Sequence, residues 1–558
     1  MFRSLRYIFR EAPYVLMALE LVLVYFYILE LFKPNYTVLL HGIIWVSVYR
    51  LGLLDQGFYG LIPLILVSLA LGLCVYLAGG FTVIKASKLA HYILVLLTTI
   101  NCLLLLYWMT YALSPPTSLD YGFSPHKLFL DLEAGLFHVY APIYPLLLLV
   151  MLYTWVPLAI CKIFKGRVRL KIRCNSTLNT VSNYRPSDDI FMRRLGLTSA
   201  LLLSIALPLI PYLPSINPEF KPVSVDIRYY SMWLGNMLTS DCWGAVEYAF
   251  YGTENGNRPL YLLLLYGLTN LRIPKEIVLN FEALFITPLF TLTIYFTAKR
   301  LFGDNLQAFL SSLAGLLGFN MTVGMFAGIF AAWTGLTLFY LCIILVSSLP
   351  SSRWCLAGAI ASSVALLFIH PWTWSLLMCV LTVNLASSLR CAEVDKYLLA
   401  VLIVNAIVDA LKTLMFPNYG GLICSAISLS SRIGLNPLLD LPRSLHRLST
   451  TYLGGLFFNP LHMLLSLMGL LSIFRMRDKF SRLIVTWVAI ASLIFPFSRI
   501  GVQSHLLFAT PFPLLISRGL YEMSRLLSRL DRRLPRLIQM FFLVSSLTYT
   551  VRALCNLI

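Results

Sequence analysis

Long apolar runs separated by short polar or basic segments dominate this sequence. Most of the runs are about 20 residues long, enough to cross a hydrocarbon core of about 30 Å. Inside lipid the backbone must satisfy its own hydrogen bonds, so these runs predict helices. The pattern therefore predicts an all-α, polytopic membrane protein. The apolar runs lie at about 13–33, 37–54, 58–79, 90–113, 138–161, 195–213, 277–298, 306–319, 326–346, 356–369, 372–386, 398–415, 453–474, 483–497, 506–516 and 537–551.

Basic residues at the ends of these runs predict the orientation. Loops rich in Lys and Arg stay on the cytoplasmic side, which places 162–194 and the Lys299-Arg300 pair inside. The N-terminus, with Arg3, Arg6 and Arg10, is expected inside as well. For this count to hold, either one of the first five runs does not cross, of which 37–54 is the weakest, or the N-terminus is external. The mostly apolar segment 260–271 must not cross either. As a helix it covers only about 18 Å, so we expect it to lie along the membrane surface.

The polar and basic segment 162–194 also predicts a domain boundary. The expected organisation is an N-terminal transmembrane region of unknown role (1–161), a basic cytoplasmic linker (162–194) and a second membrane module (195–558). The run at 506–516 is expected to lead inward to another basic loop. That loop would hold Arg518, Arg525, Arg529, Arg532, Arg533 and Arg536.

Composition supports the membrane assignment and narrows the function. Only 12% of residues are charged and 59% are hydrophobic, whereas soluble domains carry about 25% charged residues. The net charge of +19 (43 basic minus 24 acidic residues) sits in short loops. It therefore indicates topology signals and attraction to anionic lipid, not nucleic-acid binding. We find no P-loop, no G-x-G-x-x-G and no nucleophile elbow. The sequence also shows no soluble nucleotide-binding domain.

The most polar long interruption, at about 211–271, contains the first candidate for chemistry. Asp226 follows directly after a predicted span, where an ionised carboxylate is suited to act as a general base. Arg228 is close enough in sequence to orient it, and Tyr229 and Tyr230 suit an interfacial aromatic belt. The alternative is an ordinary loop carboxylate. The neighbouring cation and aromatic residues favour an active site at a membrane surface.

Several cations are expected on the external side, where positive charge is least common. Fixed cations there are candidates to stabilise negative charge. Arg499 lies at the external end of a run, and a second group lies in the loop at about 417–453. The alternative for that group is a solvated or headgroup-facing loop. Its members are Arg432, Arg443, His446 and Arg447.

Four further residues have both a functional and a structural interpretation. His370 precedes a proline at a predicted outer helix end, where a single histidine is more often structural. Glu282 lies near the outer end of its run and is able to face the site. Asp409 and Lys412 are three residues apart within one run, which is consistent with a local ion pair.

Taken in order, short motifs in 195–558 resemble the GT-C superfamily of integral membrane glycosyltransferases. That family shows a His-Pro-Pro-Leu-Tyr-Tyr-type segment, an Ala-Arg-Arg-Leu-Phe-Gly-type helix end, an outer His-Pro and a C-terminal Arg…Pro helix. The ordered set begins with a charged-then-aromatic loop after the opening helix of the module, Asp226-Ile-Arg228-Tyr229-Tyr230. The segments that correspond to the four family motifs are, in order, Arg258-Pro259-Leu260-Tyr261, Ala298-Lys299-Arg300-Leu301-Phe302-Gly303, Phe368-Ile-His370-Pro371 and Ser498-Arg499-Ile-Gly-Val-Gln-Ser-His505-Leu-Leu-Phe-Ala-Thr-Pro511. The chain departs from the family in having Arg258 where histidine is usual. It also lacks a clear pair of acidic residues in the first loop.

The resemblance implies a GT-C-like helix bundle with juxtamembrane helices in the first external loop of the module. It also implies transfer of a sugar from a polyprenyl-phosphate donor to an acceptor glycan, lipid or protein on the non-cytoplasmic side of the cell membrane. Asp226 would be the catalytic base. The expected substrate-binding residues are Arg228, Tyr229, Tyr230, Arg258, Tyr261, His370, Arg443, Arg447, Arg499 and His505.

Two other functions fit the same sequence. A transporter or flippase of lipid-linked sugars would show internal repeats and helices broken near the midplane; we find no repeat, and the polar residues gather in one external loop. A membrane scaffold would need no chemistry at all. No clear metal-ligand set is present, so a requirement for a divalent metal stays open.

Overall fold

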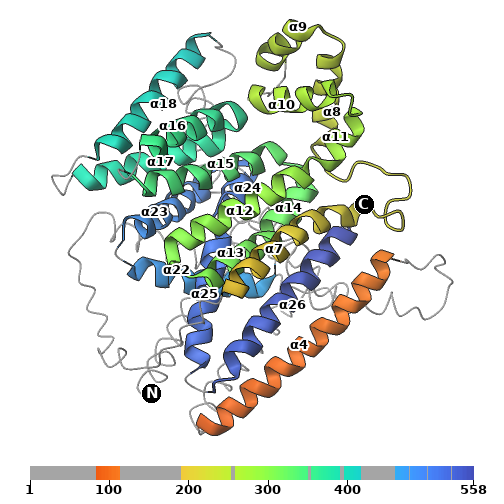
Figure 1. Ribbon diagram of the computed structural model, residues 1–558, viewed down its shortest axis with the longest axis vertical. Coiled ribbons are helices and arrows are strands. Elements are labelled where there is room, and N and C mark those ends of the chain that lie inside the picture. Colours follow the sequence, from red (N-terminus) through yellow and green to blue (C-terminus); the bar gives the residue numbers. More distant parts are fainter. Residues whose placement is uncertain are drawn as a thin grey trace, which may run out of the picture.

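The computed structural model describes residues 83–113, 190–252, 258–349, 353–389, 395–415, 459–476, 478–498, 500–528 and 531–557 (Figure 1). These ranges are built from helices. The first half contains α4 (Val83–Leu113), α7 (Ile190–Ala206), η3 (Leu207–Tyr212), α8 (Ile227–Leu238), α9 (Cys242–Glu247), η4 (Tyr248–Gly252), α10 (Pro259–Asn270), α11 (Lys275–Phe281), α12 (Ala283–Phe302), α13 (Asn305–Leu316) and α14 (Phe319–Ala327). The second half contains α15 (Phe330–Ser347), α16 (Arg353–Ile369), α17 (Pro371–Leu389), α18 (Lys396–Met415), α22 (Pro460–Arg475), α23 (Lys479–Ile494), η7 (Phe495–Phe497), α24 (Ile500–Phe508), α25 (Phe512–Leu527) and α26 (Leu534–Cys555).

Five helical segments of the described ranges are long and apolar enough to cross a membrane. They are Lys275–Phe302, Asn305–Ala327, Phe330–Ser347, Lys396–Met415 and Leu534–Cys555. The prediction of a helical bundle with several membrane-spanning segments is confirmed at this level. The segment predicted at 260–271 is the 12-residue helix α10. It is not among the helices long enough to span, as the charge count requires. The runs expected at 13–33, 37–54, 58–79 and 138–161 lie outside the described residues.

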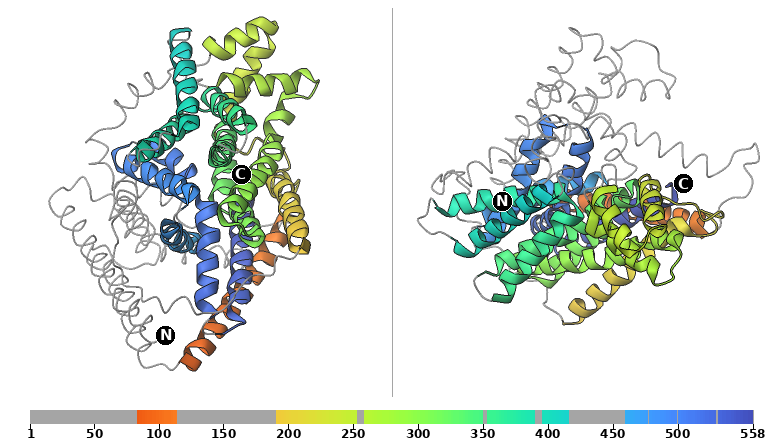
Figure 2. Two further views of the ribbon diagram at one scale, coloured as in Figure 1. Left: turned by 60° about the vertical axis from the view of Figure 1, so that its left-hand side comes forward. Right: turned by 90° about the horizontal axis from the view of Figure 1, so that it is seen from above.

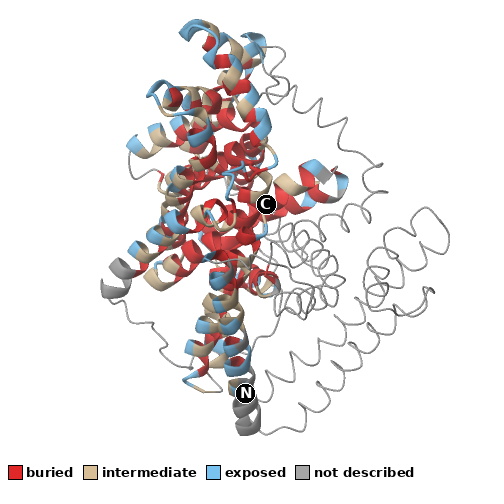
Figure 3. Ribbon diagram, turned by 90° about the vertical axis from the view of Figure 1, so that its right-hand side faces the viewer, coloured by how far each residue is buried: buried red, intermediate tan, exposed pale blue. Residues whose placement is uncertain are grey.

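Close backbone approach holds two of the central helices together. Gly469 on α22 and Gly519 on α25 face each other. A Cβ atom at Gly469 would lie 1.8 Å from the carbonyl oxygen of Leu515, and one at Gly519 would lie 1.8 Å from that of Leu465. No larger residue fits at either position without separating the helices. Around this contact the buried residues gather in the middle of the bundle, with exposed residues toward its ends (Figure 3).

The N-terminal region contributes α4, which runs beside the last helix, α26 (Figures 1 and 2). The Thr548 hydroxyl donates to the carbonyl of Asn101 at 3.0 Å, and the Ser215 hydroxyl donates to the carbonyl of Ala112. This part of 1–161 therefore packs directly against the C-terminal module. At the start of that module, α7 begins at Ile190, five residues inside the segment expected as a linker.

Two predicted spans are broken helices. The run at 306–319 is part of α13 and α14, which separate at Gly318, and the next helix begins only at Phe330, not at 326. The run at 506–516 is divided between α24 and α25 at Thr510 and Pro511, because proline has no backbone N–H to continue a helix. The two breaks meet, since the Asn320 side chain donates to the carbonyl of Phe508 at 3.0 Å.

The prediction of a basic loop directly after 516 is wrong. α25 continues to Leu527, so Arg518 and Arg525 are helical. Both pair with Glu522, at 3.0 and 2.8 Å. Arg518 also donates to Ser472 at 2.8 Å and to Gln307 at 3.3 Å. Gln307, Ser472, Arg518, Glu522 and Arg525 are called the inner cluster below. A count of arginines alone does not include Glu522, whose carboxylate pairs with both Arg518 and Arg525.

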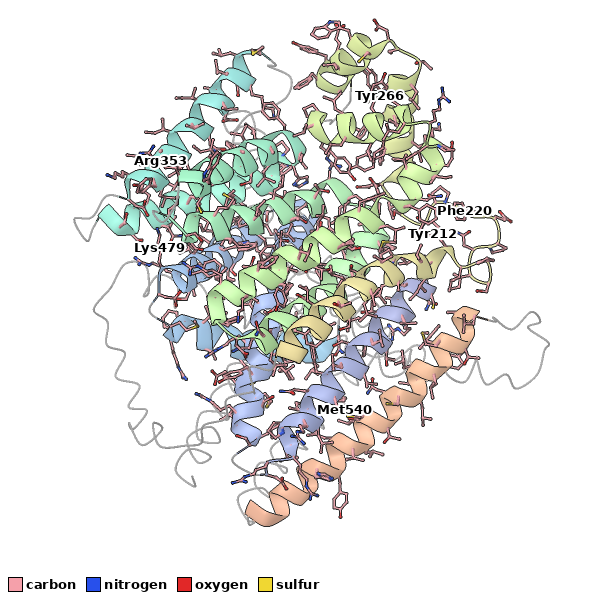
Figure 4. The ribbon with its side chains drawn as sticks, in the orientation of Figure 1. Tyr212, Phe220, Tyr266, Arg353, Lys479 and Met540 are labelled. Atoms are coloured by element: carbon pink, nitrogen blue, oxygen red, sulfur yellow. The ribbon has the colours of Figure 1, made fainter. Side chains whose placement is uncertain are left out.

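Arg353 and Lys479 lie along one side of the molecule, and Tyr212 and Phe220 lie along the opposite side (Figure 4). α8, α10 and α11 form a layer at the end of the bundle that is expected to lie outside, where α10 packs on α16 (Figure 1).

Candidate active site

The loop before Asp226 is held against a broken membrane helix. The backbone N–H groups of Val225 and Asp226 each donate, at 3.1 Å, to carbonyls at the end of α14. Carbonyls at a helix end lack partners within the helix, so this contact satisfies both segments. Gly328 makes it possible. It has φ of 70°, and a Cβ there would lie 2.6 Å from the Cβ of Ser224.

Asp226 stands at the N-cap position, directly before α8, but its side chain does not cap the helix. Its side chain accepts no hydrogen bond from the helix N-terminus, so the carboxylate remains available. Burial raises the pKa of this carboxyl above its ordinary value of 3.8, and the charges of Arg258 and then Arg228 oppose the rise. The half-buried carboxylate thus lies in the field of two cations, and its raised pKa makes it a stronger base than an exposed aspartate.

Arg258 is fixed by an aromatic pair. Its Nη1 donates to the Tyr230 hydroxyl, and its guanidinium lies 5.6 Å from the centre of the Tyr230 ring. The Tyr261 ring packs edge-on against Tyr230 at 5.6 Å between centroids. Burial raises the pKa of Tyr230 to about 12, so its hydroxyl stays protonated. α8 and α10 therefore hold the guanidinium in one position.

Glu282 is joined to this set of residues through Tyr261. The Tyr261 hydroxyl donates to Oε2 of Glu282. Glu282 is only 3% exposed, and its other oxygen, Oε1, is buried without a hydrogen-bond partner. The Glu282 charge also acts on Tyr230. The sequence placed Glu282 near the outer end of its run, but only the fold shows that it supports Tyr261.

His370 brings a third part of the chain to the site. It is 1% exposed, at the turn between α16 and α17. Its Nδ1 accepts from the backbone N–H of Thr373 at 3.3 Å and lies 2.7 Å from the Thr373 hydroxyl. Nδ1 therefore carries no proton, and Nε2 holds it. That Nε2 is buried without a partner. A purely structural role for His370 explains the contacts of Nδ1 but not the burial of Nε2 without a partner.

His505 and Arg258 lie near His370. The two imidazole rings are 5.4 Å apart between centroids. Burial, followed by the charges of Arg258 and His505, holds the pKa of His370 well below its usual range, and Arg258 acts on His505 as well. α8, α10, the α16–α17 turn and α24 thus converge. Asp226, Tyr230, Arg258, Glu282 and His370 are called the outer cluster below.

Lys412 is a buried cation with contacts beyond the expected local pair. The charge of Asp409, three residues earlier, acts on it. Its Nζ also reaches across to α16, where it donates to the carbonyl of Leu367 at 3.3 Å and lies 5.3 Å from the ring centre of Phe368. Lys412 therefore stabilises the helix end that presents His370. Ionisable residues within membrane spans are functional candidates by default, and that was the available signal.

The remaining expected residues divide into two groups. Arg228 and Tyr229 are exposed and contact each other, with Arg228 donating to the Tyr229 hydroxyl at 3.2 Å. Arg443, Arg447 and Arg499 lie outside the described residues. Within the described ranges, no group of three His, Cys, Asp or Glu side chains is placed to hold a metal ion.

Comparison with known proteins gives no further assignment. No family model matches the chain, and no curated protein sequence matches it.

Proposed function

We propose that this chain is a membrane glycosyltransferase of GT-C type. It would move a sugar from a polyprenyl-phosphate donor to an acceptor hydroxyl on the non-cytoplasmic side. The observation that carries the proposal is the outer cluster: a free carboxylate, a fixed guanidinium and an unpartnered imidazole N–H from separate segments. The motifs that resemble the family include Asp226, Arg258 and His370 of this cluster.

The residues support a balanced reaction. Asp226 accepts the proton of the acceptor hydroxyl as its oxygen attacks the anomeric carbon of the sugar. The bond between that carbon and the phosphate oxygen breaks, and the polyprenyl phosphate leaves with the electron pair. Arg258 and the Nε2–H of His370 are suited to stabilise its negative charge. The raised pKa of Asp226 favours proton uptake at neutral pH.

Transfer by reconstituted protein tests this proposal. The protein is incorporated in liposomes with labelled polyprenyl-phosphate sugar, and the label on an added acceptor mixture is measured. Asp226→Asn should abolish transfer, because the amide cannot take a proton. Glu247→Gln is the matched control, since Glu247 is exposed in the same external segment. Full turnover by the Asp226→Asn protein would disprove the assignment.

Transport of a lipid-linked sugar is the second candidate, because the breaks at Gly318 and Pro511 lie side by side. Broken helices are a feature of many transporters. The same liposomes separate the two functions. Movement of the labelled lipid between leaflets, with no label on any acceptor, would favour transport.

A further inference from the structure

The inner end of α12 carries a groove that the outer cluster does not use. Its volume is about 530 Å³, and it lies between α12 and α15. Phe296, Leu341 and Ile344 form its apolar wall, and Lys299 and Arg300 stand at its basic end. Arg300 lies 18 residues beyond Glu282 along α12 (300 − 282), so the basic end of the groove lies about 27 Å from the outer cluster, close to the thickness of a hydrocarbon core.

The groove opens on the side of α12 that faces away from the bundle. Phe285, Leu289 and Phe296 are 62%, 58% and 53% exposed. Together with Thr293 and Arg300 they repeat every three or four residues, which places all five on one helix face. Large apolar side chains exposed along a membrane-spanning helix contact lipid. The stripe thus leads from lipid chains to a cation at its inner end.

The two cations are not equally free. Lys299 donates to the carbonyl of Gly303 at 3.0 Å and so caps its own helix. Arg300 is exposed. Positive charge at a helix C-terminus suits the helix dipole, but that explanation requires no groove beside it. A groove with an apolar wall and two cations at one end has the shape and charge expected of a site for an acyl chain attached to an anionic headgroup.

We propose that this groove binds one anionic phospholipid of the inner leaflet. The phosphate pairs with Arg300 and Lys299, and an acyl chain follows the wall formed by Phe296, Leu341 and Ile344. The ligand is a bilayer lipid and not the proposed sugar donor, whose chemistry lies at the other end of α12. The inference goes beyond the proposed function and does not depend on it.

Lipid binding by delipidated protein tests the site. Phosphatidylglycerol and phosphatidylcholine are titrated in turn, and bound lipids are counted by native mass spectrometry. The parent should bind one phosphatidylglycerol more tightly than any phosphatidylcholine. The double variant Lys299→Gln/Arg300→Gln should bind it about 25-fold more weakly, because each cation near an anionic surface contributes roughly fivefold.

Two further variants separate the groove from general charge. Thr293→Trp fills the groove and keeps both cations, so it should also lose the tight site; Leu341→Trp replaces it if the first variant unfolds. Arg353→Gln/Arg536→Gln removes two exposed basic residues elsewhere and should keep the site. The proposal is overturned if the parent shows no preference for phosphatidylglycerol. It is also overturned if both tryptophan variants retain the site, or if polyprenyl phosphate displaces phosphatidylglycerol at equal concentration.

Discussion

The inner and outer clusters contain similar residue types but differ in how completely their hydrogen bonds are satisfied. In the inner cluster, Nε, Nη1 and Nη2 of Arg518 and both oxygens of Glu522 have partners. In the outer cluster, Oε1 of Glu282 and Nε2 of His370 are buried without partners. A buried polar group left unsatisfied costs about 1–3 kcal/mol. The inner cluster therefore fixes helix packing, whereas the outer cluster keeps capacity for a ligand.

The largest effect on stability should come from the inner cluster. Arg518→Ala removes the cation that joins Ser472 and Gln307 to Glu522, while Arg525 still pairs with Glu522. We expect a cost of about 1.5–3 kcal/mol of unfolding free energy, the value of hydrogen bonds to a charged group. Unfolding of the purified protein in detergent measures this. Arg525→Ala is the control, because Arg525 is 44% exposed and its loss should cost less than about 1 kcal/mol. Equal losses from the two variants would contradict the distinction between a structural and an open cluster.

The corresponding change in the outer cluster should affect transfer. Arg258→Ala removes the guanidinium expected to stabilise the leaving phosphate, so turnover should fall roughly 100- to 1,000-fold. The unfolding midpoint should change much less than in Arg518→Ala. Lys221→Ala, an exposed cation of the same external loop, should leave turnover unchanged. If Arg258→Ala chiefly lowers stability, the outer cluster is structural too.

A smaller effect is expected from the unpartnered nitrogen of His370. His370→Asn keeps an acceptor for the Thr373 N–H, since asparagine caps helices well, but removes Nε2–H. Turnover should fall about 10- to 100-fold, the value of one hydrogen bond to a charged group. Thr373→Ala probes the other side of the same residue by removing the hydroxyl beside Nδ1. A normal rate in His370→Asn would return His370 to a purely structural role.

The smallest effect is a shift in pH dependence. Asp226 must be ionised to act as a base, so transfer should fall as pH drops through its raised pKa. Arg258 lowers this pKa, so its removal should move the acid limb of the residual activity to higher pH. The raised value also means that the folded protein binds this proton more tightly than the unfolded chain. The Asp226 contribution to stability therefore declines as pH rises from about 3.8 upward. If the acid limb does not shift in Arg258→Ala, Arg258 does not control the pKa of Asp226.

Local pattern and charge were sufficient to predict part of this structure. The aromatic segment after Asp226 forms α8, and 260–271 forms the short helix α10, because periodicity and length are properties of the segment itself. Contacts between residues far apart in the sequence do not follow from the periodicity or length of either segment. The contact between His370 and His505 joins residues 135 positions apart (505 − 370). Glu282 supports Tyr261 only because α12 begins beneath α10.

The sequence analysis did not predict the helix breaks within two of the apolar runs. The run at 506–516 contains Pro511, whose effect on the helix was available in the sequence. Gly318 gave a weaker signal, because glycine is common in membrane helices. Its surroundings show why it is required, since a Cβ there would lie 2.4 Å from the carbonyl oxygen of Ala314. Such crowding depends on the folded backbone and not on composition.

The contact between the Asp226 loop and α14 links the two candidate functions mechanically. Val225 and Asp226 are tied through their backbone to the last carbonyls of a helix that is itself interrupted at Gly318. A movement of α14 at that interruption would carry the carboxylate with it, away from Arg258 on α10. The position of the base would then report the conformation of the membrane bundle, and an acceptor group held by Asp226 would in turn restrain the break.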